Sequence, residues 1–123
     1  MRKNREKADS YWLNKLEINT RLYFAYGSNI NQEQMEFRCN NALPVAIAYV
    51  KNFRFVINSN GVATIIPASA SVVRGVLWQI SKSDEDELDI YEGVSSNLYT
   101  KENCNVSVGY ENIDALVYIA SNS

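Results

Sequence analysis

The segment Tyr26-Gly27-Ser28-Asn29 has residue types and spacing that would support chemistry. It follows a short aromatic run typical of a buried strand, and a helix is predicted to begin just after it. Backbone N–H groups at a helix N-terminus bind anions, glycine lets a ligand approach the backbone, and Ser28 and Asn29 add hydrogen-bonding side chains. The turn would therefore hold a carboxylate or a polar carbonyl. The same residues are also consistent with a plain turn before a capped helix.

Glu92 is the second candidate, because it falls in the last turn of a predicted helix that Gly93 would end. A carboxylate there faces the negative end of the helix dipole, which disfavours its charged form and raises its pKa. That is the direction a general base needs. The alternative is a solvated glutamate on an acidic helix. The other acids of that helix are Asp84, Glu85, Asp86, Glu87 and Asp89.

Tyrosines near these two segments are candidates for a polar-tipped pocket wall, although each is equally explained as a half-buried aromatic. They are Tyr23, Tyr26, Tyr91 and Tyr99.

The composition excludes several kinds of site. The chain has 0 histidines, so a Ser-His-Asp triad and zinc sites built on histidine are impossible. Its 2 cysteines, Cys39 and Cys104, are too few for a four-cysteine metal site, and we expect them to be reduced.

Charge and hydropathy also limit the partners and the location. The formal net charge is -2 with a pI near 5.1, so nucleic-acid binding is disfavoured. No segment approaches the roughly 18 consecutive apolar residues of a membrane span, and no secretory signal is recognisable. We expect a cytoplasmic protein.

The pattern of elements predicts an α+β fold with a mainly antiparallel sheet that is able to curl into a small barrel, flanked by two or three short helices. One helix is expected to start after Asn31, and another to be capped by Ser83. Pro67 is expected to separate two strands. The predicted strands are 21–26, 45–57, 62–66, 72–80, 98–108 and 113–120.

The 123 residues suit a single domain. Residues 1–20 are interpreted as a polar tail and a short helix, and residues 21–123 as the domain. Trp12, Leu13 and Leu16 lie on one face of that short helix, which would pack on the domain or on a partner.

Several segments, in this order, resemble the γ-glutamylcyclotransferase superfamily over about residues 21 to 120. They are Leu22 to Ile30, Met35 with Arg38-Cys39, Gly61 to Ile65, Gly75 to Trp78, and Leu88 to Val94.

The resemblance implies a small β-barrel without a cofactor. It implies an enzyme that cyclises a γ-glutamyl group to 5-oxoproline and releases an amine or amino acid. The backbone of Tyr23 to Asn29 would cradle the γ-glutamyl group, with Tyr26, Gly27 and Ser28 inside that stretch. Glu92 would take the proton from the substrate's α-ammonium, and Tyr99 would steady the substrate. The nucleophile belongs to the substrate, so neither histidine nor metal is required.

The chain departs from the family pattern after the strand that matches residues 115–120, where the family continues with a further pocket-side aromatic and a closing segment. We therefore also expect one of three things: a minimal member, weak activity, or a homodimer whose neighbouring subunit completes the wall. Two other functions remain open: a non-catalytic module that binds γ-glutamyl compounds or amino acids, and a partner-binding domain that uses the N-terminal helix.

Overall fold

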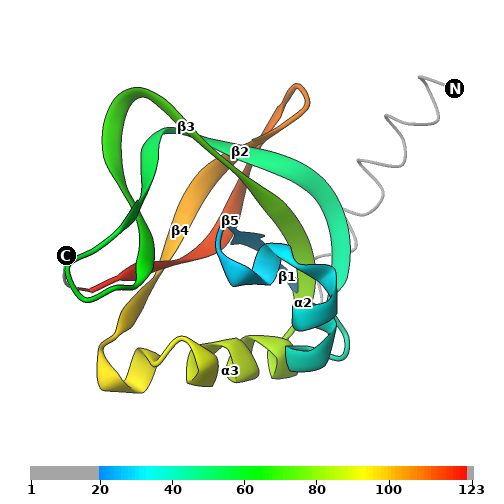
Figure 1. Ribbon diagram of the computed structural model, residues 1–123. Coiled ribbons are helices and arrows are strands. Elements are labelled where there is room, and N and C mark those ends of the chain that lie inside the picture. The colour runs from blue at the N-terminus through cyan, green and yellow to red at the C-terminus, as the bar shows by residue number, and fades with distance from the viewer. Residues whose placement is uncertain (1–19, 122–123) are drawn as a thin grey trace, which may run out of the picture.

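The computed structural model describes residues 20–121, which form five strands, two α-helices and two 3-10 helices (Figure 1). The predicted Trp12, Leu13 and Leu16 face and nearly all of the predicted tail lie outside the described residues, and Thr20 is the first residue of β1. The strands are β1 (Thr20–Ala25), β2 (Leu43–Ile57), β3 (Ala63–Ser81), β4 (Tyr99–Val108) and β5 (Glu111–Ala120). The helices are η2 (Ser28–Ile30), α2 (Gln32–Arg38), α3 (Lys82–Tyr91) and η3 (Val94–Ser96).

The strands close into a small mixed barrel in the order β1-β3-β2-β4-β5. All pairings are antiparallel except that of β1 with β5, which is parallel. Two seams are narrow: β1 meets β5 only at Tyr23 and Leu116, and β2 meets β4 only at Tyr49 and Ser107. The predicted α+β class, with its mainly antiparallel barrel and short flanking helices, is confirmed.

β2 and β3 form one long hairpin, so the expectation that Pro67 divides two strands is wrong. Pro67 pairs with Phe53 and lies beside a register shift. The hydrogen bonding between β2 and β3 is already interrupted there, so the N–H that proline lacks removes little from the sheet. Asn52 and Ala70 on the two strands there have positive φ angles of 66° and 60°, which bend the hairpin without ending it. The two strands expected at 62–66 and 72–80 are thus one strand, β3, and the structure has five strands where six were expected.

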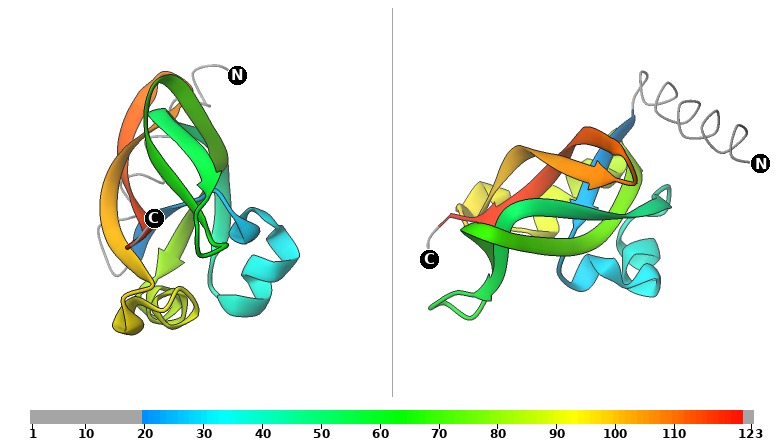
Figure 2. Two further views of the ribbon diagram at one scale, coloured as in Figure 1. Left: turned by 60° about the vertical axis from the view of Figure 1, so that its left-hand side comes forward. Right: turned by 90° about the horizontal axis from the view of Figure 1, so that it is seen from above.

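β1 is buried on both faces, which explains its run of aromatic residues. Leu22 and Phe24 point into the barrel, whereas Tyr23 and Ala25 pack in a second cluster with residues of both helices. Figure 2 shows α2 and α3 side by side at the same end of the barrel. The strand therefore carries its carboxyl end, and the turn after it, directly to the helices.

The two α-helices begin with side-chain caps. The Asn31 side chain accepts a hydrogen bond from Gln34 N at 3.0 Å, as the spacing predicts. For α3 the cap is Ser81, not the expected Ser83. The Ser81 hydroxyl accepts from Asp84 N at 3.1 Å, while the Asp84 carboxylate accepts from Ser81 N at 3.0 Å. The sequence offers two serines with the same local chemistry, and the end of β3 at Ser81 selects the first.

The cap leads to the first prediction. Ser81→Ala should lower the free energy of unfolding by about 1 kcal/mol, because it removes the acceptor of the Asp84 amide in the first turn. Within the described residues, the Ser83 hydroxyl contacts only the Ser81 hydroxyl, at 3.0 Å. Ser83→Ala should therefore change the free energy of unfolding by less than about 0.5 kcal/mol. Urea unfolding of the two variants measures the difference, and equal losses would contradict the assignment of Ser81 as the cap.

The acids of α3 are not all solvated, which corrects the simplest interpretation of that helix. Asp84 and Glu85 are buried, at 2% and 8% exposure. Arg21 donates to Glu85 at 2.8 Å, and Lys101 forms ion pairs with both Glu85 and Asp89. The helix is thereby fixed to β1 and β4. Among residues 20–121, no helix is long and apolar enough to cross a membrane.

Candidate active site

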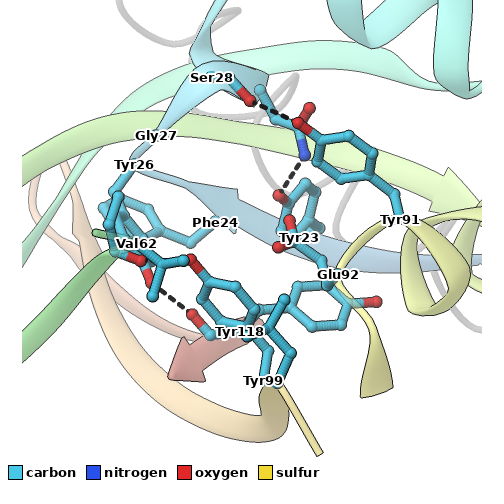
Figure 3. Close-up of a pocket in the computed structure, with 13 residues that line it drawn as sticks. Tyr23, Phe24, Tyr26, Gly27, Ser28, Val62, Tyr91, Glu92, Tyr99 and Tyr118 are labelled. Atoms are coloured by element: carbon cyan, nitrogen blue, oxygen red, sulfur yellow. Dashed lines mark hydrogen bonds between the residues drawn. The ribbon is translucent and has the colours of Figure 1, made fainter. Parts of the chain in front are cut away.

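A cavity of about 390 Å³ opens at the end of the barrel where β1 and β5 finish and β3 and β4 begin (Figure 3). This volume falls in the range of small-molecule sites. Every site residue predicted from the sequence lines this one cavity: Tyr23, Tyr26, Gly27, Ser28, Asn29, Glu92 and Tyr99.

Glu92 is the C-cap of α3 and lies in the cavity wall. Gly93 follows with a left-handed φ of 66°, which ends the helix and leaves Glu92 at its tip. Figure 3 shows Glu92 and Tyr23 pointing toward one another inside the cavity. The helix and its glycine stop therefore place one carboxylate against the end of β1.

The pKa of Glu92 is raised to about 7. Burial is the main cause, because it penalises the charged carboxylate, and the positive charge of Arg38 opposes it. The direction agrees with the sequence analysis, and burial of the carboxylate is its main cause here. The carboxylate can thus exchange a proton near neutral pH.

The turn after β1 is a 3-10 helix before it becomes α2. Ile30 N and Asn31 N donate to the carbonyls of Gly27 and Ser28, both at 3.0 Å. The amides of Ser28 and Asn29 lie at the start of this helix, where no intrahelical acceptor is available. A Cβ at Gly27 would have nothing within 4 Å, so this part of the wall is open.

Asn29 is buried and organises the floor of the cavity. Its side-chain amide nitrogen donates to Tyr23 Oη at 2.9 Å, and its main-chain carbonyl accepts from the Trp78 indole N–H at 3.1 Å. The role of Asn29 is therefore to orient β1 and β3 side chains as much as to face the cavity.

Three of the tyrosines that line the cavity with Glu92 donate their hydroxyl protons to other groups of the fold. Tyr26 donates to the Tyr118 carbonyl at 2.5 Å, Tyr99 to the Ala63 carbonyl at 2.5 Å, and Tyr118 to Asp89 at 2.7 Å. The Tyr23 hydroxyl accepts from Asn29, and within residues 20–121 its own proton has no acceptor. Burial raises the pKa of Tyr23, so it stays protonated and remains a donor.

The sequence analysis missed part of the wall. Tyr118 belongs to β5, and only the parallel seam with β1 brings it beside Tyr23, with ring centroids 5.7 Å apart. No local pattern signals that seam. Arg38 was named within the segments that resemble the family but was given no role at the site, although it contacts Ser28, Asn29 and Tyr91. The other missed lining residues are Phe24, Val62, Ala63 and Leu98.

The groups around the cavity define what it can do. It offers one carboxylate that titrates near neutrality, a buried phenol donor and backbone amides, enclosed by aromatic rings. Within residues 20–121, no group of three or more Cys, Asp and Glu residues is placed to hold a metal ion. Such a set suits proton transfer on a polar substrate that carries its own nucleophile.

Comparisons with known proteins agree on one family. A family model described as gamma-glutamyl cyclotransferase, AIG2-like, matches residues 23–123. Gamma-glutamylcyclotransferase of Bos taurus is 33% identical over 96 residues, which cover 70% of this chain and 51% of the bovine protein. Its counterpart in Homo sapiens is 34% identical over 88 residues, covering 63% of this chain and 47% of the human protein. The chain thus spans about half the length of the curated relatives it matches.

Solved structures give the same result. One described as gamma-glutamyl cyclotransferase superimposes with a TM-score of 0.79 at 31% identity, covering 84% of this chain and 68% of that one. An AIG2-like protein of Mus musculus, at 17% identity and a TM-score of 0.71, shows that the fold is shared.

Proposed function

Because the chain belongs to the gamma-glutamyl cyclotransferase, AIG2-like family, we propose that it cyclises a γ-glutamyl group to 5-oxoproline and releases the attached amine, with Glu92 as the general base. The observation that carries the proposal is the placement of Glu92, with its pKa raised to about 7, in the same cavity as the turn that follows β1.

In this reaction the ionised Glu92 carboxylate removes one proton from the substrate's α-ammonium. The freed amine attacks the γ-carbonyl carbon, and a C–N bond forms while the carbonyl electrons move to oxygen. The protonated Glu92 gives its proton to the leaving nitrogen, the oxyanion collapses, and the bond to that nitrogen breaks. The ring nitrogen, which still carries a positive charge and two hydrogens, then gives its second proton to the regenerated Glu92 carboxylate. Glu92 passes this proton to the released amine, which departs as an ammonium. Atoms and charges balance, so the reaction requires no co-reactant.

The remaining groups would bind and orient the substrate. The amides of Ser28 and Asn29 and the Tyr23 hydroxyl are donors suited to the γ-glutamyl carboxylate or to the oxyanion. Tyr26 and Tyr99, whose hydroxyls are engaged by backbone carbonyls, would form rigid walls. Holding the amine and carbonyl of one molecule together supplies much of the rate by proximity.

Release of 5-oxoproline from γ-glutamyl amino acids, glutathione and γ-glutamyl amines tests the proposal. Release from at least one compound, saturable with substrate, supports it and identifies the amine half. Binding without release by the folded protein would instead favour the non-catalytic module. The names of the curated relatives specify the γ-glutamyl group but not the amine that is attached to it.

The raised pKa of Glu92 predicts the pH dependence of the rate. Because the base must be ionised, kcat/KM should rise with pH and reach half its maximum near pH 7. Initial rates from pH 3.5 to 9 in buffers of constant ionic strength measure the midpoint. A midpoint near 4.5, the ordinary value for glutamate, would show that Glu92 is solvated or is not the base.

A further inference from the structure

Arg38 is the last residue of α2, and it contacts both segments that carry the proposed site. Its side chain donates to Ser28 Oγ at 3.2 Å and to Asn29 Oδ1. It also donates to Tyr91 Oη at 2.6 Å, and the guanidinium carbon lies 3.6 Å from the centre of the Tyr91 ring. One half-buried cation therefore joins the turn after β1 to the end of α3.

These contacts connect the cradle with the base. Tyr91 immediately precedes Glu92, and Ser28 and Asn29 belong to the turn. The direct side-chain contact between the two segments is a 3.3 Å approach of Ser28 Oγ to Tyr91 Oη (Figure 3). We propose that Arg38 is a positioning residue that clamps the Ser28-Asn29 turn to the C-terminal end of α3 and so fixes Glu92 relative to the cradle.

Asn29 passes the effect of this clamp to the cavity floor. Arg38 holds Asn29 Oδ1, which forces the amide nitrogen of Asn29 to face Tyr23 Oη at 2.9 Å. The orientation of the buried Tyr23 phenol thus depends on Arg38. A planar guanidinium suits this task, because it serves acceptors in several directions and stacks on an aromatic ring at once.

Arg38 also sets the charge balance at Glu92. The groups that face Glu92 from the neighbouring elements are the phenols of Tyr23, Tyr26, Tyr91, Tyr99 and Tyr118. Those of Tyr23, Tyr26, Tyr99 and Tyr118 have raised pKa values and stay neutral. In the described part of the chain, Arg38 is the charged group that opposes burial of the carboxylate. Removing its charge should therefore raise the pKa of Glu92 further.

Three variants test the proposal: Arg38→Gln, Arg38→Lys and the control Arg74→Gln, which makes the same charge change at an exposed position of β3. The first readout is the Glu92 titration by NMR of ¹³C-labelled carboxyl groups, assigned with Glu92→Gln. The second readout is kcat/KM for 5-oxoproline release, measured against pH. Only this second readout depends on the proposed function.

Arg38→Gln should move the Glu92 titration to higher pH and lower kcat/KM on the order of 10- to 100-fold, as misplacement of a reacting group does. Arg38→Lys should keep the titration near its original midpoint, while the rate stays reduced because an ammonium cannot form the same fork of hydrogen bonds. Arg74→Gln should change neither readout.

An unchanged titration together with kcat/KM within twofold in Arg38→Gln would overturn the proposal, as would equal shifts in Arg74→Gln. If Arg38→Gln does not fold, Arg38→Lys decides: a reduced rate at an unchanged midpoint supports the clamp, and an unchanged rate overturns it. If the unsubstituted protein releases no 5-oxoproline, the proposed function fails, and the NMR titration still decides whether Arg38 acts on Glu92.

Discussion

Glu92→Gln should lower kcat for 5-oxoproline release by about 10²- to 10⁴-fold, the range that general-base catalysis contributes. Glutamine keeps the size and the hydrogen-bonding shape of the side chain but cannot accept the proton of the substrate's α-ammonium. Substrate binding should be retained, so KM should change far less than kcat. Steady-state kinetics by chromatographic detection of 5-oxoproline measure both.

The same substitution should stabilise the fold above neutral pH. The pKa of Glu92 is about 7 in the folded protein against an ordinary 4.5, so the folded state binds more protons than the unfolded state between these values. Above pH 7 an ionised, buried carboxylate opposes folding. Glu92→Gln should therefore raise the free energy of unfolding by about 1 to 3 kcal/mol at pH 8, and the gain should vanish below pH 4.5.

Glu87→Gln is the matched control, because Glu87 is an exposed acid of the same helix. It should leave both the rate and the stability near their original values. A Glu92→Gln variant that retains full kcat would show that another group takes the proton.

Gly75→Ala should destabilise the fold by about 3 kcal/mol, because the added methyl has no room. A Cβ at Gly75 would lie 2.3 Å from the Ala25 carbonyl oxygen and 2.7 Å from the Phe24 ring. Phe24 and Ala25 belong to β1, which pairs with β3 and leads into the cavity turn. The overlap must therefore push apart the two strands that hold the site, and thermal unfolding should show a large loss.

Gly109→Ala separates this steric effect from the backbone effect of losing a glycine. Gly109 has a φ of 58°, but a Cβ there would have nothing within 4 Å. The expected cost is only the roughly 1 to 2 kcal/mol of a left-handed alanine. A smaller loss at Gly75 than at Gly109 would contradict the close packing of β1 on β3.

Local signals predicted the elements well, because they depend on neighbours in sequence. The helix start at Asn31 and the left-handed stop at Gly93 were readable from residue type alone. Pro67 and the cap of α3 were misjudged for a tertiary reason. A register shift tolerates the proline within a long hairpin, and the length of β3 decides which serine begins the helix.

The candidate site was predictable where motif residues are contiguous and not where the barrel assembles them. Residues 26–29 and Glu92 could be found in the sequence, whereas Tyr118 reaches the cavity through a parallel strand pairing. Arg38 was missed because its acceptors, including Ser28 and Tyr91, are scattered across the chain. Its role depends on contacts in the folded structure, which the spacing of residues along the sequence does not predict.

The parallel pairing of β1 with β5 also decides where other molecules can be tethered to this domain. Two parallel neighbours begin at the same end of the barrel, so Thr20 starts far from the cavity, paired with Ser81. The carboxyl end of β5 emerges beside the cavity, where Ser121 N donates to the carbonyl of the lining residue Leu98 at 3.0 Å. A dye, surface or fusion partner joined there would crowd the cavity, whereas one joined ahead of β1 starts from the opposite end.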